Sequence, residues 1–333
     1  MKAMLSITPG GPQTLQLQDA PVPEPGAGEV RIRVRACGVN YPDTLIIEDK
    51  YQFRPNRPFS PGGEVAGEID AVGEGVDGLA VGDRVIGMVG WGGMAEYVVT
   101  RAVKCAPIPD GMPWDEAAAF VFTYGTSYHA LKQRGQLGQG DTLLVLGAAG
   151  GVGLAAVELG RAMGARVIAA ASSQEKVDLA CAHGAAAGVV YPPGPFDKDG
   201  AKALATLFKD AVGGDGANVV YDGVGGAYAE AALRAIAWEG RFLVVGFPAG
   251  IPAIPLNLPL LKGCQIVGVF LGSWSERDPA ANQRNINELV QLYAAGKIKP
   301  HVSAHYPLAK AGQAITDLAE RRALGKIVVM IDG

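Results

Sequence analysis

The chain has 333 residues, of which 49% are hydrophobic and 19% charged, with 47 glycines and 22 prolines. At roughly 150 residues per domain, this length predicts about two domains with a core in each, and the composition excludes a mainly disordered chain. A formal net charge of −4 leaves no basic excess for nucleic acid phosphates, so we expect no nucleic-acid partner.

The N-terminal segment and the cysteines favour a cytoplasmic protein. Residues 1–9 reach a proline before an apolar segment of signal-peptide length can form, and no uncharged run of about 18 apolar residues follows, so we expect no membrane association. The cysteines stand singly, and their spacing predicts neither a disulfide framework nor a zinc knuckle. They are Cys37, Cys105, Cys181 and Cys264.

The first 122 residues predict a small β-barrel. Residues 29–35 alternate charged and apolar side chains, as a half-buried strand does. Residues 67–73 and 83–87 are further short strands between glycine turns.

After Pro113, apolar strands alternate with alanine-rich helices, which predicts an α/β fold with a parallel, doubly wound sheet. The expected strands are residues 142–146, 166–170, 188–190, 218–221, 241–245 and 265–270, and the expected helices begin at Gly151, Gln174 and Ala227. A polar loop at 272–279 and a helix at about 282–295 follow. A last strand at 326–331 can return to the first domain.

The strand at 142–146 leads into a glycine-rich loop, Gly147-Ala-Ala-Gly-Gly-Val-Gly153, and then into a helix. Small residues here let the backbone turn sharply, approach a diphosphate and pack the helix against its strand, while the helix N-terminus offers N–H groups and a partial positive charge. Glycine-rich turns are common, but between a strand and a helix this one predicts a dinucleotide site at Gly150, Gly151 and Val152.

The end of the next strand indicates which dinucleotide binds. An NAD site usually has an acidic residue about 20 residues beyond the loop, whereas NADP needs hydroxyls and a cation for its 2′-phosphate. This strand end has no acidic residue, but Ser172, Ser173 and Lys176 form a group suited to a phosphate at a helix start. Ser172 with Glu175 also fits a capping box, which would leave the other hydroxyl and the lysine available. We therefore expect NADPH as the cofactor.

Three strings in the first domain, together with the glycine-rich loop and residues 172–176, carry a family resemblance. The strings are Ala36-Cys-Gly-Val-Asn-Tyr-Pro-Asp43, Pro61-Gly-Gly-Glu-Val-Ala-Gly67 and Val81-Gly-Asp-Arg-Val85. In this order they resemble the quinone oxidoreductase branch of the medium-chain dehydrogenase/reductase superfamily. The resemblance implies a Rossmann NADP-binding domain, residues 123–271, inserted into a GroES-like β-barrel catalytic domain of residues 1–122 and 272–333. It also implies a homodimer.

Two positions depart from the zinc-dependent members of that superfamily. By resemblance, those members have a cysteine ligand where this chain has Asn40 and a histidine ligand where it has Gly63. The lobe that would hold a structural zinc is also missing, since residues 85–100 contain no cysteine. Zinc needs three or four N, S or O ligands within tetrahedral reach, so we expect no metal site.

Without a metal, the remaining chemistry is hydride transfer from the nicotinamide to an acceptor activated by conjugation, a quinone or an enone. The anion that forms needs hydrogen-bond donors and a proton. By resemblance, Asn40 faces the substrate or nicotinamide; alternatively it shapes the turn before Pro42 while Asp43 caps the next helix. Tyr51 lines the cleft or is an ordinary surface aromatic. Thr123 lies beside the nicotinamide or caps a helix.

Five more residues complete the expected cofactor site. Ligands of open α/β sheets bind outside the carboxyl ends of the strands, so Val224, Gly246 and Phe247 should flank the ribose and nicotinamide, although plain turns also explain the glycines. By resemblance, Tyr191 is on the adenosine side and Arg322 is near the 2′-phosphate. A solvated charge is the alternative for Arg322.

The sequence therefore predicts an NADPH-dependent, zinc-independent reductase of quinones or other conjugated carbonyl compounds. Two alternatives stay open: an enoyl-CoA or enoyl-thioester reductase, and a non-catalytic NADPH-binding protein with a structural, sensing or RNA-contacting role. The loops at 51–61, 87–93 and 272–279 shape the pocket, so the motifs do not specify the substrate.

Overall fold

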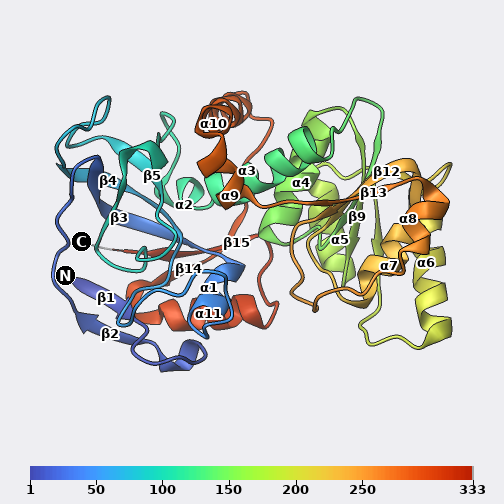
Figure 1. The fold of residues 1–333 in the computed structure, drawn as a ribbon, viewed down its shortest axis with the longest axis horizontal. Coiled ribbons are helices and arrows are strands. Elements are labelled where there is room, and N and C mark those ends of the chain that lie inside the picture. The colour runs from blue at the N-terminus through green and yellow to red at the C-terminus, as the bar shows by residue number, and fades with distance from the viewer. Residues whose placement is uncertain (332–333) are drawn as a thin grey trace. The chain divides into compact units, whose positions relative to one another are not determined.

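The computed structural model describes residues 1–331, which divide into two compact units (Figure 1). Unit 1 contains Met1–Phe122 and the chain from Pro300 onward, and unit 2 contains Thr123–Lys299. Both are built around sheets, and together they confirm the predicted α/β class with a parallel sheet and a separate β-rich domain.

Unit 2 is built on a six-stranded parallel sheet with the strand order β10-β9-β8-β11-β12-β13. The strands are β8 (Thr142–Leu146), β9 (Arg166–Ala171), β10 (Ala187–Val190), β11 (Ala217–Asp222), β12 (Ile236–Val244) and β13 (Gln265–Gly268). The strand order reverses between β8 and β11, which pair directly although 70 residues lie between the end of β8 and the start of β11. Such a switch point opens a crevice at the carboxyl ends of the strands, where ligands of this fold bind.

Helices enclose this sheet and follow its strands in alternation. They are α4 (Gly151–Ala162), α5 (Gln174–Ala182), α6 (Lys198–Val212), α7 (Ala227–Arg234) and α8 (Asn257–Lys262). Residues 143–146 of β8 are fully buried, as expected for a strand covered on both faces. The core between sheet and helices includes Leu144, Ile168, Phe208 and Phe242.

Residues 272–299 lie in unit 2, whereas the sequence analysis placed them in the catalytic domain. The expected polar loop at 272–279 is wrong, because α9 (Leu271–Arg277) and the start of α10 (Pro279–Ala294) occupy it. Asp278 caps α10 by accepting a hydrogen bond from the Ala281 N–H at 3.0 Å. The polar side chains therefore reflect the exposure of a helix rather than a loop.

Packing contacts explain why α9 and α10 belong to unit 2. The Trp274 ring stacks on His129 with the ring centroids 4.1 Å apart. Gln133 and Asn285 exchange two hydrogen bonds of 2.9 and 3.1 Å. His129 ends α3 (Val121–His129), and Gln133 lies in the π-helical turn η3 (Ala130–Arg134) that continues it.

Unit 1 contains a seven-stranded sheet with the order β14-β15-β3-β4-β5-β7, in which β6 also pairs with β3. The strands are β3 (Glu29–Val39), β4 (Glu64–Val72), β5 (Arg84–Met88), β6 (Tyr97–Arg101), β7 (Cys105–Pro107), β14 (Val302–Pro307) and β15 (Lys326–Met330). A separate ribbon pairs β1 (Lys2–Leu5) with β2 (Gln16–Asp19). The helices of unit 1 are α1 (Tyr41–Ile46), α2 (Trp114–Ala117) and α11 (Ala311–Ala319). Single 3₁₀ turns lie at η1 (Pro12–Thr14), η2 (Ala102–Lys104) and η4 (Leu308–Lys310).

Both ends of the chain contribute to the unit 1 sheet. The predicted alternation in β3 is present, since Val30, Ile32 and Val34 are buried between partly exposed arginines. β15 pairs antiparallel with the end of β3, with Ile327 opposite Val39. Figure 1 shows these C-terminal elements, coloured red, beside the blue N-terminal strands. Among residues 1–331, no helix has both the length and the apolar character needed to cross a bilayer.

Candidate functional site

The glycine-rich loop has the strand–loop–helix geometry that the sequence predicts. It joins the end of β8 to α4, whose N-cap is Gly150 in an extended conformation. A Cβ on Gly153 would lie 2.1 Å from the carbonyl oxygen of Gly147, so only glycine allows α4 to start this close to the loop. Because the N-cap residue has no side chain, α4 has no side-chain cap, and its first turn is suited to an anionic ligand.

Val224 lies next to this loop at the switch point of the sheet, and Phe247 lies next to Gly225. A Cβ on Gly147 would come within 2.9 Å of Val224 Cγ2, and one on Gly225 within 2.5 Å of Phe247 Cβ. The N–H of Gly246 donates to the carbonyl oxygen of Asp222 at 3.2 Å. The structure thus brings Val224 beside the glycine-rich loop, and places Gly246 and Phe247 against Asp222 and Gly225 at the carboxyl end of β11.

Asp222, which sequence reasoning did not single out, fixes this arrangement. It ends β11 and is only 1% exposed, and its Oδ1 accepts hydrogen bonds from the N–H groups of Val224 (2.9 Å) and Gly225 (2.8 Å). Burial raises the pKa of Asp222 to about 6, while these two N–H groups oppose the rise. An acidic residue at the end of an apolar strand, followed by glycines, was the available signal.

The group expected to bind the 2′-phosphate is assembled at the end of β9. Ser173 is the N-cap of α5, and its Oγ accepts a hydrogen bond from the Lys176 N–H at 3.4 Å. The capping role considered for Ser172 with Glu175 is therefore wrong, because α5 begins one residue later. Ser172 is exposed, and its Oγ accepts from Lys176 Nζ at 3.2 Å, so a hydroxyl and an ammonium lie together there.

Tyr191 follows β10 and lies beside the same strand end. Its N–H donates to the carbonyl oxygen of Ala171 at 2.9 Å, immediately before Ser172. Its ring is 7% exposed and packs against Tyr228, with centroids 4.9 Å apart. The ring is thus part of the unit 2 core.

Thr123 and Arg322 occupy different surroundings. Thr123 is 2% exposed and lies within α3, so the capping alternative is wrong, since this helix already starts at Val121. Arg322 belongs to unit 1, where its guanidinium pairs with the carboxylates of Asp317 and Glu320. It is held in an ion-pair network within its own unit.

Asn40 is the N-cap of α1 and is nearly buried, at 6% exposure. Its backbone N–H donates to Asp43 Oδ2 at 2.8 Å, which is the turn-shaping contact considered as the alternative. Its side chain is also fixed, because Nδ2 donates to the Gly38 carbonyl oxygen at 3.2 Å and Oδ1 accepts from Lys326 Nζ at 2.7 Å. Asn40 and Asp43 also form a capping box at the start of α1, so the Asn40 side chain contributes to the turn as well.

Tyr51 lies close enough to Asp43, in the region of Asn40, for the charge of Asp43 to act on it. Burial raises the pKa of Asp43 to about 6, opposed by hydrogen bonds from the backbone N–H groups of Asn40 and Gly62 and by the charge of Lys326. Burial, and then the charge of Asp43, raise the pKa of Tyr51. Tyr51 is half-buried and packs on the unit 1 core, so it is not an ordinary surface aromatic.

Glu64 and Lys326 are two charged residues of this region that the sequence analysis missed. Glu64 has no exposed surface, and burial raises its pKa to about 7, against the opposing effects of Lys326, the Phe122 N–H and Asn40. Lys326 is 5% exposed, and burial lowers its pKa. A lysine opening an otherwise apolar strand was the only signal in the sequence.

The donors around Asn40 do not fit a zinc ion. Asp43 and Glu64 face the ammonium of Lys326, which already supplies a positive charge there. Gly63 has no side chain to act as a ligand. Among residues 1–331, no group of three or more His, Cys, Asp or Glu side chains is arranged to hold a metal ion.

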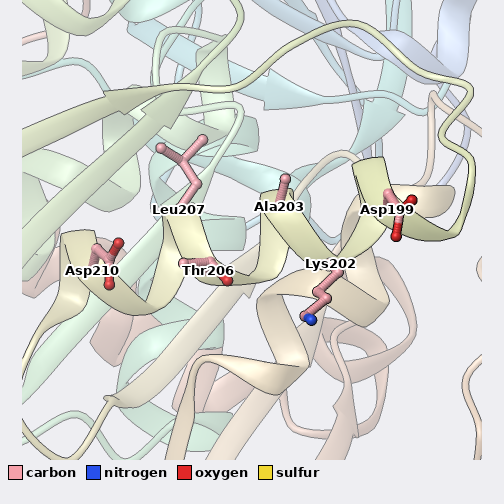
Figure 2. Close-up of a pocket in the computed structure, with 6 residues that line it drawn as sticks. All are labelled: Asp199, Lys202, Ala203, Thr206, Leu207 and Asp210. Atoms are coloured by element: carbon pink, nitrogen blue, oxygen red, sulfur yellow. The ribbon is translucent and has the colours of Figure 1, made fainter.

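A hollow on the surface of unit 2 is lined by residues of α6. Figure 2 shows the six side chains that line it, all from one side of α6. They are Asp199, Lys202, Ala203, Thr206, Leu207 and Asp210. All but Leu207 are exposed, and none is a predicted site residue.

Comparison with known proteins defines a two-domain dehydrogenase. Residues 26–110 match the family model of the alcohol dehydrogenase GroES-like domain, and residues 151–289 match that of the zinc-binding dehydrogenases. A quinone oxidoreductase-like protein 2 homolog from Nematostella vectensis is 38% identical over 308 residues, covering 91% of this chain and 82% of the relative. The quinone oxidoreductase of Pseudomonas aeruginosa is 35% identical over 325 residues, covering 96% and 97%.

Solved structures agree with this assignment. Escherichia coli quinone oxidoreductase complexed with NADPH matches with a TM-score of 0.90 and 27% identity, covering 99% of this chain and 100% of that one. A mycobacterial protein complexed with NADPH matches with a TM-score of 0.92 and 32% identity, over 99% and 100%. The chain belongs to the quinone oxidoreductase branch of the medium-chain dehydrogenase/reductase superfamily, as its motifs predicted.

Proposed function

We propose that this protein transfers hydride from NADPH to quinones or other conjugated carbonyl compounds without a metal ion. Its family makes it an oxidoreductase. The observation that carries the choice of cofactor is the Ser172–Lys176 pair at the end of β9, where no acidic residue stands. A hydroxyl and a cation suit the 2′-phosphate of NADPH, and two similar proteins have been solved with NADPH.

The proposed cofactor residues of unit 2 follow the carboxyl edge of its sheet from strand to strand. Gly150, Gly151 and Val152 take the diphosphate; Ser172, Ser173 and Lys176 take the 2′-phosphate; and Tyr191 serves the adenosine half. Val224, Gly246 and Phe247 serve the nicotinamide half, and Arg322 is proposed near the 2′-phosphate. Bound NADPH supplies the hydride.

The acceptor side of the reaction is proposed at Asn40, Tyr51 and Thr123. A quinone or enone is already polarised by conjugation, so reduction requires stabilisation of the developing anion and a proton rather than a Lewis acid. The Asn40 carboxamide is held in one orientation and can donate a hydrogen bond to that anion. The donor set around it, which includes the ammonium of Lys326, supports a zinc-independent reaction.

We also propose a homodimer formed through the β13 edge of the unit 2 sheet. β13 is the last strand in the sheet order, and the nearby surface exposes large apolar side chains. They are Trp238, Leu256, Leu260, Leu261 and Ile266. An open edge strand with an apolar surface suits contact with a second copy.

The four cysteines are free thiols, which supports the proposed cytoplasmic location.

The test is NADPH oxidation by the purified, chelator-washed protein with a naphthoquinone, a simple enone and crotonyl-CoA as separate acceptors. We expect turnover of the quinone or the enone, with NADPH preferred to NADH and no stimulation by zinc. Faster reaction with crotonyl-CoA than with its pantetheine thioester would identify an enoyl-thioester reductase, because only that enzyme gains rate from the CoA portion. Tight NADPH binding without any turnover would identify a non-catalytic protein.

A further inference from the structure

We propose that Lys326 is a positioning residue that holds the Asn40 carboxamide for the reaction and is itself held by Glu64. The inference rests on the proposed function, in which Asn40 lies at the reacting centre. Lys326 Nζ donates to Asn40 Oδ1 at 2.7 Å and to the Val39 carbonyl oxygen at 3.0 Å. It also lies 3.9 Å from Glu64 Oε2. Lys326 and Asn40 are 286 residues apart in the chain.

The contact to Oδ1 determines which way the carboxamide faces. An asparagine amide has an acceptor end and a donor end, and an ammonium accepts nothing, so only the oxygen can face Lys326. Nδ2 must then point away, and one of its hydrogens bonds the Gly38 carbonyl oxygen. A cation on the amide oxygen also polarises the N–H bonds, which makes them stronger donors to a developing anion.

Glu64 explains how a lysine can remain charged at this depth. Its Oε1 accepts a hydrogen bond of 2.7 Å from the Phe122 N–H in the first turn of α3, which fixes the carboxylate. Cys37, Asp43 and Glu64 are the titratable groups whose charges act on Lys326, and both carboxylates favour its charged form. The ammonium donates its hydrogen bonds to Asn40 and Val39, while Glu64 at 3.9 Å and the charge of Asp43 favour its charged form.

Stability alone does not account for this pair. Replacing a buried ion pair by apolar side chains of similar volume is often neutral or stabilising. The short, charge-assisted bond to a proposed site residue is the specific feature that an apolar pair would not provide. We therefore assign the pair to the orientation of Asn40.

The experiment compares K326M, K326R and the double variant E64Q/K326M, each alone and combined with N40A. Thermal midpoints, NADPH affinity, and kcat and KM for a quinone at saturating NADPH are measured. We expect K326M to lower kcat at least tenfold and to change the NADPH Kd less than twofold, because Lys326 contacts Val39, Asn40 and Glu64, none of which is a proposed cofactor residue. K326R should recover part of the kcat.

E64Q/K326M separates positioning from charge balance. It removes Glu64 and Lys326 together, and Asp43 keeps its hydrogen bonds from the backbone N–H groups of Asn40 and Gly62. Its thermal midpoint should therefore return towards that of the wild type while kcat stays low. In the N40A background, K326M should lower kcat less than a further twofold, since residues that act through one another are not additive. Wild-type kcat in E64Q/K326M, or losses from N40A and K326M that multiply, would overturn the inference.

A readout independent of turnover is the side-chain amide NMR signal of Asn40 in protein labelled with ¹⁵N-asparagine, assigned by its loss in N40A. We expect this signal to shift in K326M and to stay near its wild-type position in K326R. An unchanged signal in K326M contradicts the inference. Wild-type protein that reduces no acceptor contradicts the proposed function instead, and that result is visible before any variant is made.

Discussion

Replacing Gly153 with alanine tests whether the glycine-rich loop is shaped by packing, and replacing Gly150 tests whether it is shaped for a ligand. A Cβ on Gly153 would lie 2.1 Å from the Gly147 carbonyl oxygen, which is backbone and cannot rotate away. A Cβ on Gly150 would lie 3.4 Å from the same oxygen, and Gly150 has a φ of −80° that alanine adopts freely. Alanine at position 153 therefore disturbs the packing of the loop, whereas alanine at position 150 fits the fold and can disturb only a bound ligand.

Gly153→Ala should destabilise unit 2. Forcing an extra methyl group into a packed contact costs about 1–3 kcal/mol. Unit 2 spans Thr123–Lys299, and for a unit of this size each kcal/mol lowers the melting temperature by about 2–4 °C. We expect the cofactor-free protein to melt about 2–12 °C lower, because the first turn of α4 must move away from the loop.

Gly150→Ala is the matched control. The added methyl group meets only an ordinary contact, so the melting temperature without cofactor should change by less than about 1 °C. NADPH affinity should nevertheless fall roughly tenfold, because the methyl group stands where the backbone must approach the diphosphate.

Differential scanning fluorimetry and NADPH fluorescence titration of both variants and the wild type decide the matter. An unchanged melting temperature in Gly153→Ala would refute the packing argument. Wild-type NADPH affinity in Gly150→Ala would refute the assignment of the loop to the diphosphate.

Three further predictions concern the cofactor, pH and assembly. Lys176→Met should weaken NADPH binding at least roughly tenfold, because one charge-assisted hydrogen bond is lost, and should leave NADH binding unchanged when both are measured by calorimetry. An equal loss of affinity for NADPH and NADH contradicts the assignment of Lys176 to the 2′-phosphate. Burial raises the pKa of Asp222 from 3.8 to about 6, so its stabilising contribution is present below pH 3.8 and is lost as the pH rises through 6. The stability of Asp222→Asn relative to the wild type should therefore increase by about 2 kcal/mol between pH 4 and 7, and a constant difference in urea unfolding contradicts this. Leu260→Glu should convert the proposed dimer to a monomer in light scattering, because it places a charge on the exposed apolar surface. A monomeric mass for the wild-type protein contradicts the proposed dimer.

Local patterns determined most of the fold. The apolar run at 142–146 followed by glycines predicts both β8 and the start of α4 at Gly151, and both are present. Parallel strands end at one edge of their sheet, so residues after successive strands come together without further information. Val224 thus lies beside the glycine-rich loop, and Phe247 lies beside Gly225, as the order of strands and helices implied.

The capping residue of α5 and the segment at 272–279 were not determined by pattern. Ser172 and Ser173 both have hydroxyls that can cap a helix, and only the backbone conformation selects Ser173. Polar residues at 272–279 are compatible with a loop or with an exposed helix. Trp274 stacking on His129 favours the helix, and that contact joins residues remote in the chain.

By itself, the sequence determined the alternating strands and helices of the unit 2 sheet, the family and the position of the glycine-rich loop, because each depends on neighbours a few residues away. Tertiary structure alone decided that Asp222, Glu64 and Lys326 are buried and what they hold. A charged side chain has the same identity on a surface and in a core. Its free energy and its pKa depend on the groups that surround it, and for Lys326 those groups come from β3, α1 and β4.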